Sequence, residues 1–209
     1  MNVLVFGAAG PTGLLFVKQA LATGHRVRAV VRNPRQVPVS DPRLDVRAGE
    51  VLDRRSYDKT FVGVDAVVST LSAPFSPRAR TLLSDATRNI VESMRSNNVR
   101  RLIVVSSGAT HPGRDPNQPF LFERVVKPLF AGFYDELRLT EEIVMRSGLD
   151  WTLLRAPRVV NRRGSGQFRS KPNAFTLPHG TTLPREDLVA AALAQLGPSS
   201  VCQAIALAT

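Results

Sequence analysis

The stretch Gly7-Ala8-Ala9-Gly10-Pro11-Thr12-Gly13 follows the short apolar run 2–6 and leads into an amphipathic segment over residues 11–23. Glycines at the end of a buried strand allow a tight turn, and without a Cβ the backbone can approach a phosphate closely. The helix that follows offers free N–H groups and the positive end of its dipole to an anion, and Thr12 can add a hydroxyl donor. The stretch therefore predicts a strand–turn–helix unit that binds the pyrophosphate of a dinucleotide through Gly7, Gly10, Pro11, Thr12 and Gly13. A turn without a ligand is the less favoured alternative.

Short apolar runs alternate with amphipathic segments along the rest of the chain. We expect strands over residues 2–6, 26–31, 45–48, 65–70, 101–105, 151–154 and 201–207, and helices over residues 11–23, 54–61, 81–96, 135–146 and 185–196. This alternation predicts βαβ crossovers in one α/β Rossmann domain over residues 1–209, with a doubly wound, mainly parallel sheet. Residues 107–132 and 158–184 are rich in Gly and Pro and interrupt the rhythm. Because ligands of such sheets bind beyond the carboxyl ends of the strands, both stretches are expected to form a small, loop-rich region that walls a substrate pocket.

The composition favours a small-molecule partner over a macromolecular one. The net charge is +11, from 28 basic and 17 acidic residues, and all but four of the basic residues are arginines spread over the whole chain. A solvated basic surface is favoured over nucleic-acid binding, which stays open as an alternative. No apolar run is long enough to span a membrane, and no signal peptide is visible. We therefore expect a cytoplasmic protein, and the sequence gives no indication of its oligomeric state.

We expect the single cysteine and the three histidines to have no catalytic or metal-binding role. Cys202 lies in the apolar run 201–207 and is expected to be a buried strand residue that forms no disulfide. His25, His111 and His179 have no Cys, Asp or Glu at metal-ligand spacing. We therefore predict no metal site.

Two arginines at the end of the second predicted strand favour one dinucleotide over the other. An NAD site needs an acid near this point for the ribose hydroxyls, whereas an NADP site needs a cation for the 2′-phosphate. No acid occurs between Phe6 and Asp41, while Arg32 and Arg35 stand at the strand's end. The planar guanidinium suits a phosphate. The pattern predicts NADP(H) as cofactor, with two ordinary surface arginines as the alternative.

The GxxGxxG spacing resembles the opening of the atypical and extended short-chain dehydrogenase/reductases, which include the NmrA-like proteins and the biliverdin reductase B (flavin reductase) type. The resemblance continues through residues 49–53, 65–71, 89–92 and 99–107, and residues 147–157 are similar to the family's SGLDYTILRP. It implies a cofactor cleft over nearly the whole chain. The further cofactor contacts that it implies are Glu50, Val51, Leu71, Ser72, Ser106, Ala156, Pro157 and Arg158.

The sequence departs from the family where the reaction would take place. Full dehydrogenases of this kind carry Tyr-x-x-x-Lys, whereas this chain has Tyr134 and Arg138, and Arg cannot relay a proton at ordinary pH. An alignment shifted by one would place Phe133 and Leu137 there, and Tyr134 could equally be a packing residue at a helix start.

The biliverdin reductase type also lacks the Tyr–Lys pair and uses a Ser/Thr-Ser after its fifth strand, which Ser106 and Ser107 match. Its His after the sixth strand is replaced by Arg158. The candidate catalytic residues are thus Ser106, Ser107 and Tyr134, although the two serines could instead only cap the strand. The resemblance implies an NADPH-dependent oxidoreductase that transfers hydride to a small planar acceptor such as a flavin, a quinone or a conjugated carbonyl. The alternative is a non-catalytic, redox-sensing NADP(H)-binding regulator of the NmrA-like kind.

Overall fold

The first strand lies inside an eight-stranded sheet, at the point where the strand order reverses. The computed structural model describes residues 1–72, 81–113, 115 and 117–209. The sheet has the order β3-β2-β1-β4-β5-β6-β10-β8, and every neighbouring pair is parallel except β10 with β8. Its strands are β1 (Asn2–Phe6), β2 (Arg26–Val31), β3 (Leu44–Ala48), β4 (Ala66–Ser69), β5 (Arg101–Ser107), β6 (Asp150–Ala156), β8 (Arg169–Pro172) and β10 (Gln203–Ala208). This is the predicted doubly wound, mainly parallel Rossmann sheet.

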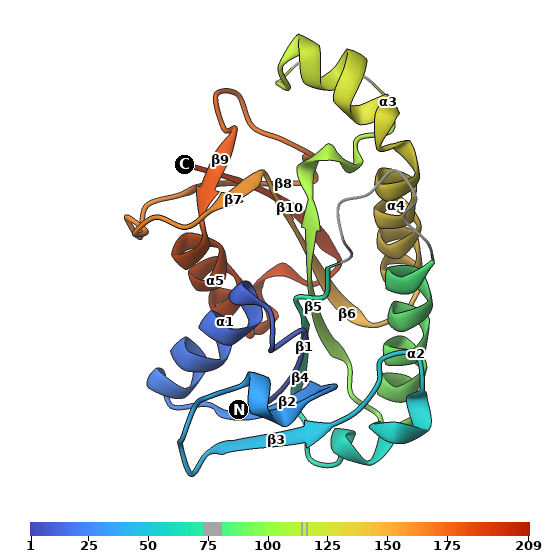
Figure 1. Ribbon diagram of the computed structural model, residues 1–209, viewed down its shortest axis with the longest axis vertical. Helices are drawn as coiled ribbons and strands as arrows, with labels where there is room; N and C mark the ends of the chain where they lie inside the picture. Colours follow the sequence, from blue (N-terminus) through green and yellow to red (C-terminus); the bar gives the residue numbers. More distant parts are fainter. Residues whose placement is uncertain (73–80, 114, 116) are drawn as a thin grey trace.

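Helices cover both faces of this sheet (Figure 1). α1 (Pro11–Ala22) and α5 (Arg185–Ala194) pack side by side on one face, with Phe16 and Leu188 in the core beneath them. α2 (Leu82–Ser96) and α4 (Ala131–Met145) cover the other face, where Ile90 and Val144 are fully buried. The apolar strands are therefore buried on both sides, as their continuous hydrophobic runs predict.

The two stretches that interrupt the sequence pattern contain more regular structure than expected. Between β5 and α4 the chain forms the 3-10 turn η4 (Gly108–Thr110), the π-helical turn η5 (Phe122–Val126) and the short helix α3 (Lys127–Leu129). Between β6 and α5 it forms β7 (Arg158–Val160), β8 and β9 (Thr182–Pro184), and β7 and β9 pair in parallel as a separate two-stranded sheet. Strands this short carry too weak a period-2 signal to be recognised in the sequence.

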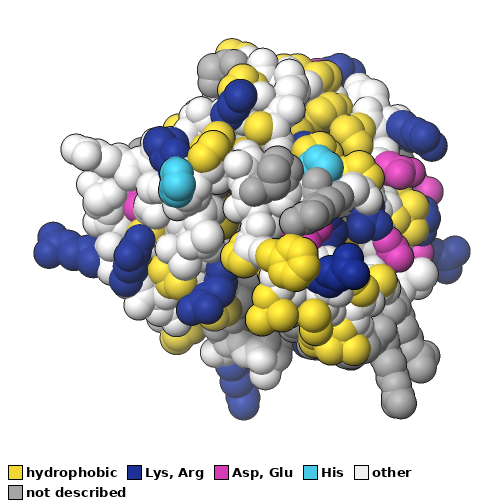
Figure 2. Space-filling model, turned by 90° about the horizontal axis from the view of Figure 1, so that it is seen from above, with side chains coloured by type: hydrophobic (Ala, Val, Ile, Leu, Met, Phe, Trp, Pro, Cys, Tyr) yellow, Lys and Arg dark blue, Asp and Glu magenta, His cyan; other side chains and the backbone are white. Residues whose placement is uncertain are grey.

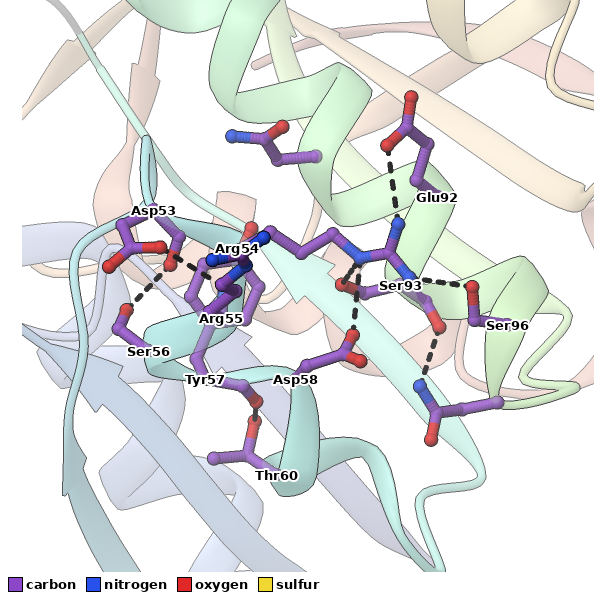
Figure 3. A network of polar contacts seen from close by, with 12 residues as sticks. Asp53, Arg54, Arg55, Ser56, Tyr57, Asp58, Thr60, Glu92, Ser93 and Ser96 are labelled. Carbon is purple, nitrogen blue, oxygen red and sulfur yellow. Dashed lines mark hydrogen bonds and ion pairs between the residues drawn. The ribbon is translucent and has the colours of Figure 1, made fainter.

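The predicted helix over residues 54–61 is wrong. The segment forms two 3-10 turns, η2 (Arg54–Ser56) and η3 (Asp58–Phe61), on either side of Tyr57. Tyr57 is buried edge-on against Phe6, with ring centroids 5.1 Å apart. Arg54 fastens the segment to α2 by donating to Ser93 Oγ at 3.1 Å and to Ser96 Oγ at 2.6 Å (Figure 3). Side-chain contacts with distant parts of the chain therefore override the local helical pattern.

The last strand and its neighbour differ from the sequence-based expectation. Cys202 is exposed and has φ +57° in a turn that precedes β10, so the prediction of a buried strand residue is wrong. Beyond β10 the sheet ends in the antiparallel strand β8, whose residues, two of them the cations Arg169 and Lys171, are all exposed. Within the part of the chain that the structure describes, no helix is long and apolar enough to cross a membrane.

Candidate functional site

The glycine-rich turn after β1 is built by close contacts between backbone atoms. Gly7 has φ +83°, and the amide of Gly10 donates to the carbonyl of Gly7 at 2.9 Å. A Cβ on Gly13 would lie 2.2 Å from the same Gly7 oxygen and 2.7 Å from Thr70 Oγ1. Gly13 therefore lets α1 start directly against the end of β1, which sets the direction of the helix N-terminus.

The N-terminus of α1 has the properties of an anion site. Its N-cap residue, Gly10, provides no side-chain hydrogen bond, and the first turn contains no acidic residue. A Cβ on Gly10 would meet only the Gly7 oxygen, at 3.3 Å, and Gly10 itself borders a cavity. Free amides, the helix dipole and open space beside Gly10 fit the pyrophosphate of a dinucleotide.

Arg185 adds a cation to this turn, and sequence reasoning did not identify it. Its Nη1 donates to Thr12 Oγ1 at 2.5 Å, and its Nε donates to Asn161 Oδ1 at 2.9 Å. In the sequence Arg185 is only the residue that opens the last predicted helix, 173 positions after Thr12. No local pattern reveals a contact over that separation.

The turn opens into a cavity of about 870 Å³ at the carboxyl ends of the strands. Figure 2 views the molecule from above Figure 1, where hydrophobic side chains gather near the middle of the face and Lys and Arg side chains are spread around it. The described residues that line the cavity come from the carboxyl ends of β1, β4, β5 and β6 or the residues that follow them, and from α2, η5, α4, β7, β9 and α5. They are Gly10, Pro11, Thr12, Thr70, Leu71, Ser72, Leu83, Val105, Ser106, Ser107, Ala109, Gln118, Pro119, Phe122, Val126, Phe133, Tyr134, Leu137, Pro157, Arg158, Val159, Thr181, Thr182, Arg185 and Leu188.

The structure brings most of the predicted site residues to this cavity. Of the predicted cofactor contacts, Gly10, Pro11, Thr12, Leu71, Ser72, Ser106, Pro157 and Arg158 line it, and the candidates Ser107 and Tyr134 do so as well. Gly7 and Gly13 instead shape the turn behind it, and Ala156 is buried in the core. An aromatic wall of Phe133, which the shifted alignment named, and Phe122, which the sequence did not indicate, faces the same space.

The remaining predicted contacts lie at the ends of β2 and β3. Arg32 and Arg35 are exposed, and Arg32 directly follows β2. Glu50 follows β3 by two residues, and its neighbour Gly49 donates its amide to the Val31 carbonyl at 3.0 Å. Val51 is half-buried, and its carbonyl accepts from Asn89 Nδ2 at 3.1 Å. These residues thus lie at the ends of the two strands on one side of β1, and none of them lines the cavity.

Tyr134 is buried in the first turn of α4, which begins at Ala131 rather than at the expected residue 135. Its ring lies edge-on to Phe122 and Phe133, and burial raises the pKa of its phenol. Arg138, four residues on, is held by the Thr110 carbonyl at 3.1 Å and by the carboxylate of Asp135. The guanidinium is therefore committed to structural contacts, and the chain has no Tyr–Lys pair of the dehydrogenase kind.

A buried ion pair lies behind the two serines. Glu141 on α4 and Arg155 on β6 are both buried, with 2.6 Å between Oε2 and Nη2. Ser106 donates to Glu141 Oε1 at 2.6 Å, while Ser107 accepts from the amide of Ala109 at 3.2 Å. Both serines therefore cap or brace local structure and also line the cavity.

Arg155 extends this ion pair to the segment after β8. It donates to the Ala174 carbonyl at 3.1 Å and lies 3.8 Å from the centre of the Phe175 ring. The buried pair thus joins α4, β6 and the segment after β8 behind the cavity. Among the described residues, no three His, Cys, Asp or Glu side chains are grouped as metal ligands would be.

Fold and site together define a Rossmann protein with a glycine-rich turn of the dinucleotide-binding kind. A family model described as NAD(P)H-binding matches residues 7–197. The chain therefore belongs to this NAD(P)H-binding family.

Individual relatives are distant. Cinnamoyl-CoA reductase 1 of Petunia hybrida is 33% identical over 128 residues, which are 54% of this chain and 38% of that relative. A short-chain dehydrogenase/reductase of Veillonella parvula, solved in complex with NADP, superposes with a TM-score of 0.82 over 100% of this chain and 94% of its own, at 18% identity. A Streptococcus pneumoniae protein provisionally assigned as an NADH-flavin reductase superposes with a TM-score of 0.79. The superposition covers 100% of this chain and 99% of the Streptococcus chain, at 19% identity. The two structural superpositions show that the agreement in fold extends over the whole chain.

Proposed function

We propose that the protein is an NADPH-dependent reductase that delivers a hydride to a small planar acceptor such as a flavin, a quinone or a conjugated carbonyl. One observation carries the proposal: a single cavity joins the anion-binding turn at Gly10 and Thr12 to an apolar wall at Phe122 and Phe133. A dinucleotide and a flat second ligand could thus lie in contact there. The Petunia relative's name as a reductase supports the same reaction type.

The proposed cofactor contacts follow from the geometry. Thr12, the free amides of α1 and Arg185 would hold the pyrophosphate, and Arg32 with Arg35 would hold the 2′-phosphate. Leu71, Ser72, Ser106 and Pro157 would border the nicotinamide half of the cofactor. NADPH, when bound, supplies the hydride. The NADP complex of the Veillonella neighbour supports this choice of cofactor.

The proposed role of the protein at the acceptor is positioning and exclusion of water. Phe122, Val126, Phe133 and Leu137 provide an apolar surface for a planar ring. The reduced acceptor gains one proton besides the hydride. Burial raises the pKa of Tyr134, and Arg138 is bound elsewhere, so we propose that the reduced acceptor takes this proton from solvent when it leaves the cavity, rather than from a tuned tyrosine.

The NADP(H)-binding regulator is the second candidate, and the commitment of Arg138 to Thr110 and Asp135 favours it. Two measurements distinguish the reductase from the regulator. NADPH absorbance is followed with a panel of flavins, quinones and enals, and NADPH binding is measured by calorimetric titration. Steady turnover with any acceptor above the rate without enzyme supports the reductase. Stoichiometric NADPH binding with no turnover in the whole panel overturns it in favour of the regulator.

A further inference from the structure

The cavity carries cations at two separate points of its wall. Among the described residues that line it, the charged side chains are Arg158 and Arg185, and no lining residue is acidic. Cations beside apolar walls create a positive potential, which attracts anionic ligands. Arg185, beside the anion-binding turn, is the cation expected for a dinucleotide site. The dinucleotide phosphates do not by themselves account for the second cation, Arg158.

The register of β7 and β9 separates these two arginines. Arg158 pairs with Thr182 at one end of the small sheet, and Val160 pairs with Pro184 at the other end, directly before Arg185. Three residues of strand correspond to about 10 Å. Arg185 contacts Thr12 of the anion-binding turn, whereas the backbone of Arg158 lies about three strand residues from that of Arg185.

The family resemblance implies that Arg158 contacts the cofactor, but its place in the structure assigns it instead to the end of the cavity where the acceptor is expected. It follows β6 by two residues, and the last residue of β6, Ala156, pairs with Ser107 of β5. Arg158 is exposed, and none of the carboxylates within residues 1–72, 81–113, 115 and 117–209 pairs with it. By contrast, Arg155, which pairs in register with Ser106, and Arg138, which donates to Thr110, are both bound to carboxylates.

We propose that Arg158 binds an anionic group, a phosphate or a carboxylate, carried by the acceptor, so that the reductase prefers anionic planar acceptors to neutral ones. This proposal rests on the proposed function for its second ligand. The planar ring packs on Phe122 and Phe133, and its charged arm reaches the guanidinium of Arg158 at the mouth of the cavity. The fork of the guanidinium fits both oxygen groups.

The test compares matched pairs of probes that differ only in charge: FMN with riboflavin for a phosphate, and a carboxylate-bearing naphthoquinone with its methyl ester for a carboxylate. We expect kcat/KM of the wild type to favour the anionic member of at least one pair by about ten- to a hundredfold, the range for one charge-assisted contact. Arg158→Gln should remove that preference, Arg158→Lys should retain part of it, and the dissociation constant for NADPH should stay unchanged in both. Whichever pair shows the preference identifies the anion.

Arg163→Gln is the matched control, because Arg163 is an exposed arginine of the neighbouring segment that does not line the cavity. It changes the net charge by the same amount and should leave the preference intact. Equal kcat/KM for both members of both pairs, or a preference that survives in Arg158→Gln, overturns the proposal. So does a loss of NADPH affinity in Arg158→Gln with an unchanged preference, since Arg158 would then bind the cofactor.

A binding measurement keeps this inference separate from the reductase assignment. If no acceptor is turned over, the quenching of FMN and riboflavin fluorescence is titrated in the presence of NADP⁺. Tighter binding of FMN that Arg158→Gln abolishes supports the anion site even though the reductase is excluded. Equal binding of both flavins, or binding of neither, overturns the anion site as well.

Discussion

Ser106 donates its hydroxyl hydrogen to Glu141, with 2.6 Å between Oγ and Oε1. The same carboxylate receives the guanidinium of Arg155, so it acts as the acceptor for both groups. A serine hydroxyl has one hydrogen, and it is used here. The oxygen of Ser106 that borders the cavity therefore offers lone pairs, and it favours a donor such as the carboxamide of a nicotinamide over a carbonyl oxygen.

Removing one partner of the ion pair behind Ser106 should strongly destabilise the fold. Removing one partner of a buried pair leaves an uncompensated charge, so Glu141→Ala should lower the free energy of unfolding by about 3–5 kcal/mol. The double variant Glu141→Leu/Arg155→Met should lose less than Glu141→Ala alone. Asp135→Ala, which breaks the exposed pair with Arg138, is the control and should cost less than about 1 kcal/mol. Urea denaturation measures all three, and equal losses in Glu141→Ala and Asp135→Ala would contradict the assignment.

Substitutions at two glycines of the turn should have different effects on NADPH binding and on stability. A side chain on Gly10 enters the space for the pyrophosphate but meets no backbone closer than 3.3 Å, so Gly10→Val should fold and lose NADPH binding. Gly13→Val places its Cβ 2.2 Å from the Gly7 oxygen and should also lower the melting temperature. Gly197→Ala, at a position with open space and ordinary φ, is the control. Calorimetry and thermal unfolding separate these effects, and undiminished NADPH affinity in Gly10→Val would exclude the turn as the phosphate site.

Tyr134 should contribute little to turnover. General acid catalysis by a tuned group contributes roughly 10²–10⁴ in rate, whereas Tyr134 has no lysine to lower its pKa. Tyr134→Phe should therefore reduce kcat by less than about tenfold. A loss in the hundreds, with NADPH affinity intact, would restore a tyrosine-based mechanism.

Alkaline pH should unfold the protein as its tyrosines ionise. Tyr57 and Tyr134 are the only two tyrosines, and burial raises the pKa of both above the ordinary 10.0. The neutral phenols stabilise the folded state below about pH 10, and this contribution falls as the pH rises further, because the unfolded chain releases its protons first. Phenolate absorbance should rise together with the loss of circular dichroism. A phenolate signal that develops fully in the folded protein would contradict the burial of both rings.

Arg32 should set the choice between the two dinucleotides. A charge-assisted contact contributes roughly 1.5–3 kcal/mol, so Arg32→Ala should weaken NADPH by about ten- to a hundredfold and leave NADH nearly unchanged. Arg32→Asp should narrow or invert the preference, because it repels the phosphate and offers the ribose hydroxyls an acceptor. The measurement is the ratio of the two dissociation constants at fixed ionic strength. A wild-type preference for NADH, or the same ratio in all three proteins, would leave Arg32 as a surface arginine only.

Local sequence patterns predict the fold and the turn at which the candidate site begins. The glycine-rich turn and the alternation of apolar runs and amphipathic helices are short-range signals, and they put Gly10 and Thr12 at the carboxyl edge of the sheet, where both line the cavity. Ser106, which the family resemblance implies, lines the same cavity. The contacts of Arg185 with Thr12 and of Arg155 with Glu141 depend on segments that only the folded chain brings together. The same holds for residues 54–61, where the burial of Tyr57 against Phe6 outweighs helical propensity.

The polar edge strand has a consequence for aggregation. β8 carries two cations and a proline and covers the far side of β10, an almost entirely apolar strand whose hydrogen-bonding groups would otherwise be open to another chain. Charges and proline on the outermost strand discourage such pairing. If the segment around β8 were cut or detached, the newly exposed edge of β10 would become a template for chain-to-chain sheet growth. Self-association would then arise together with the loss of the contacts that Ala174 and Phe175, directly after β8, make with Arg155 behind the cavity.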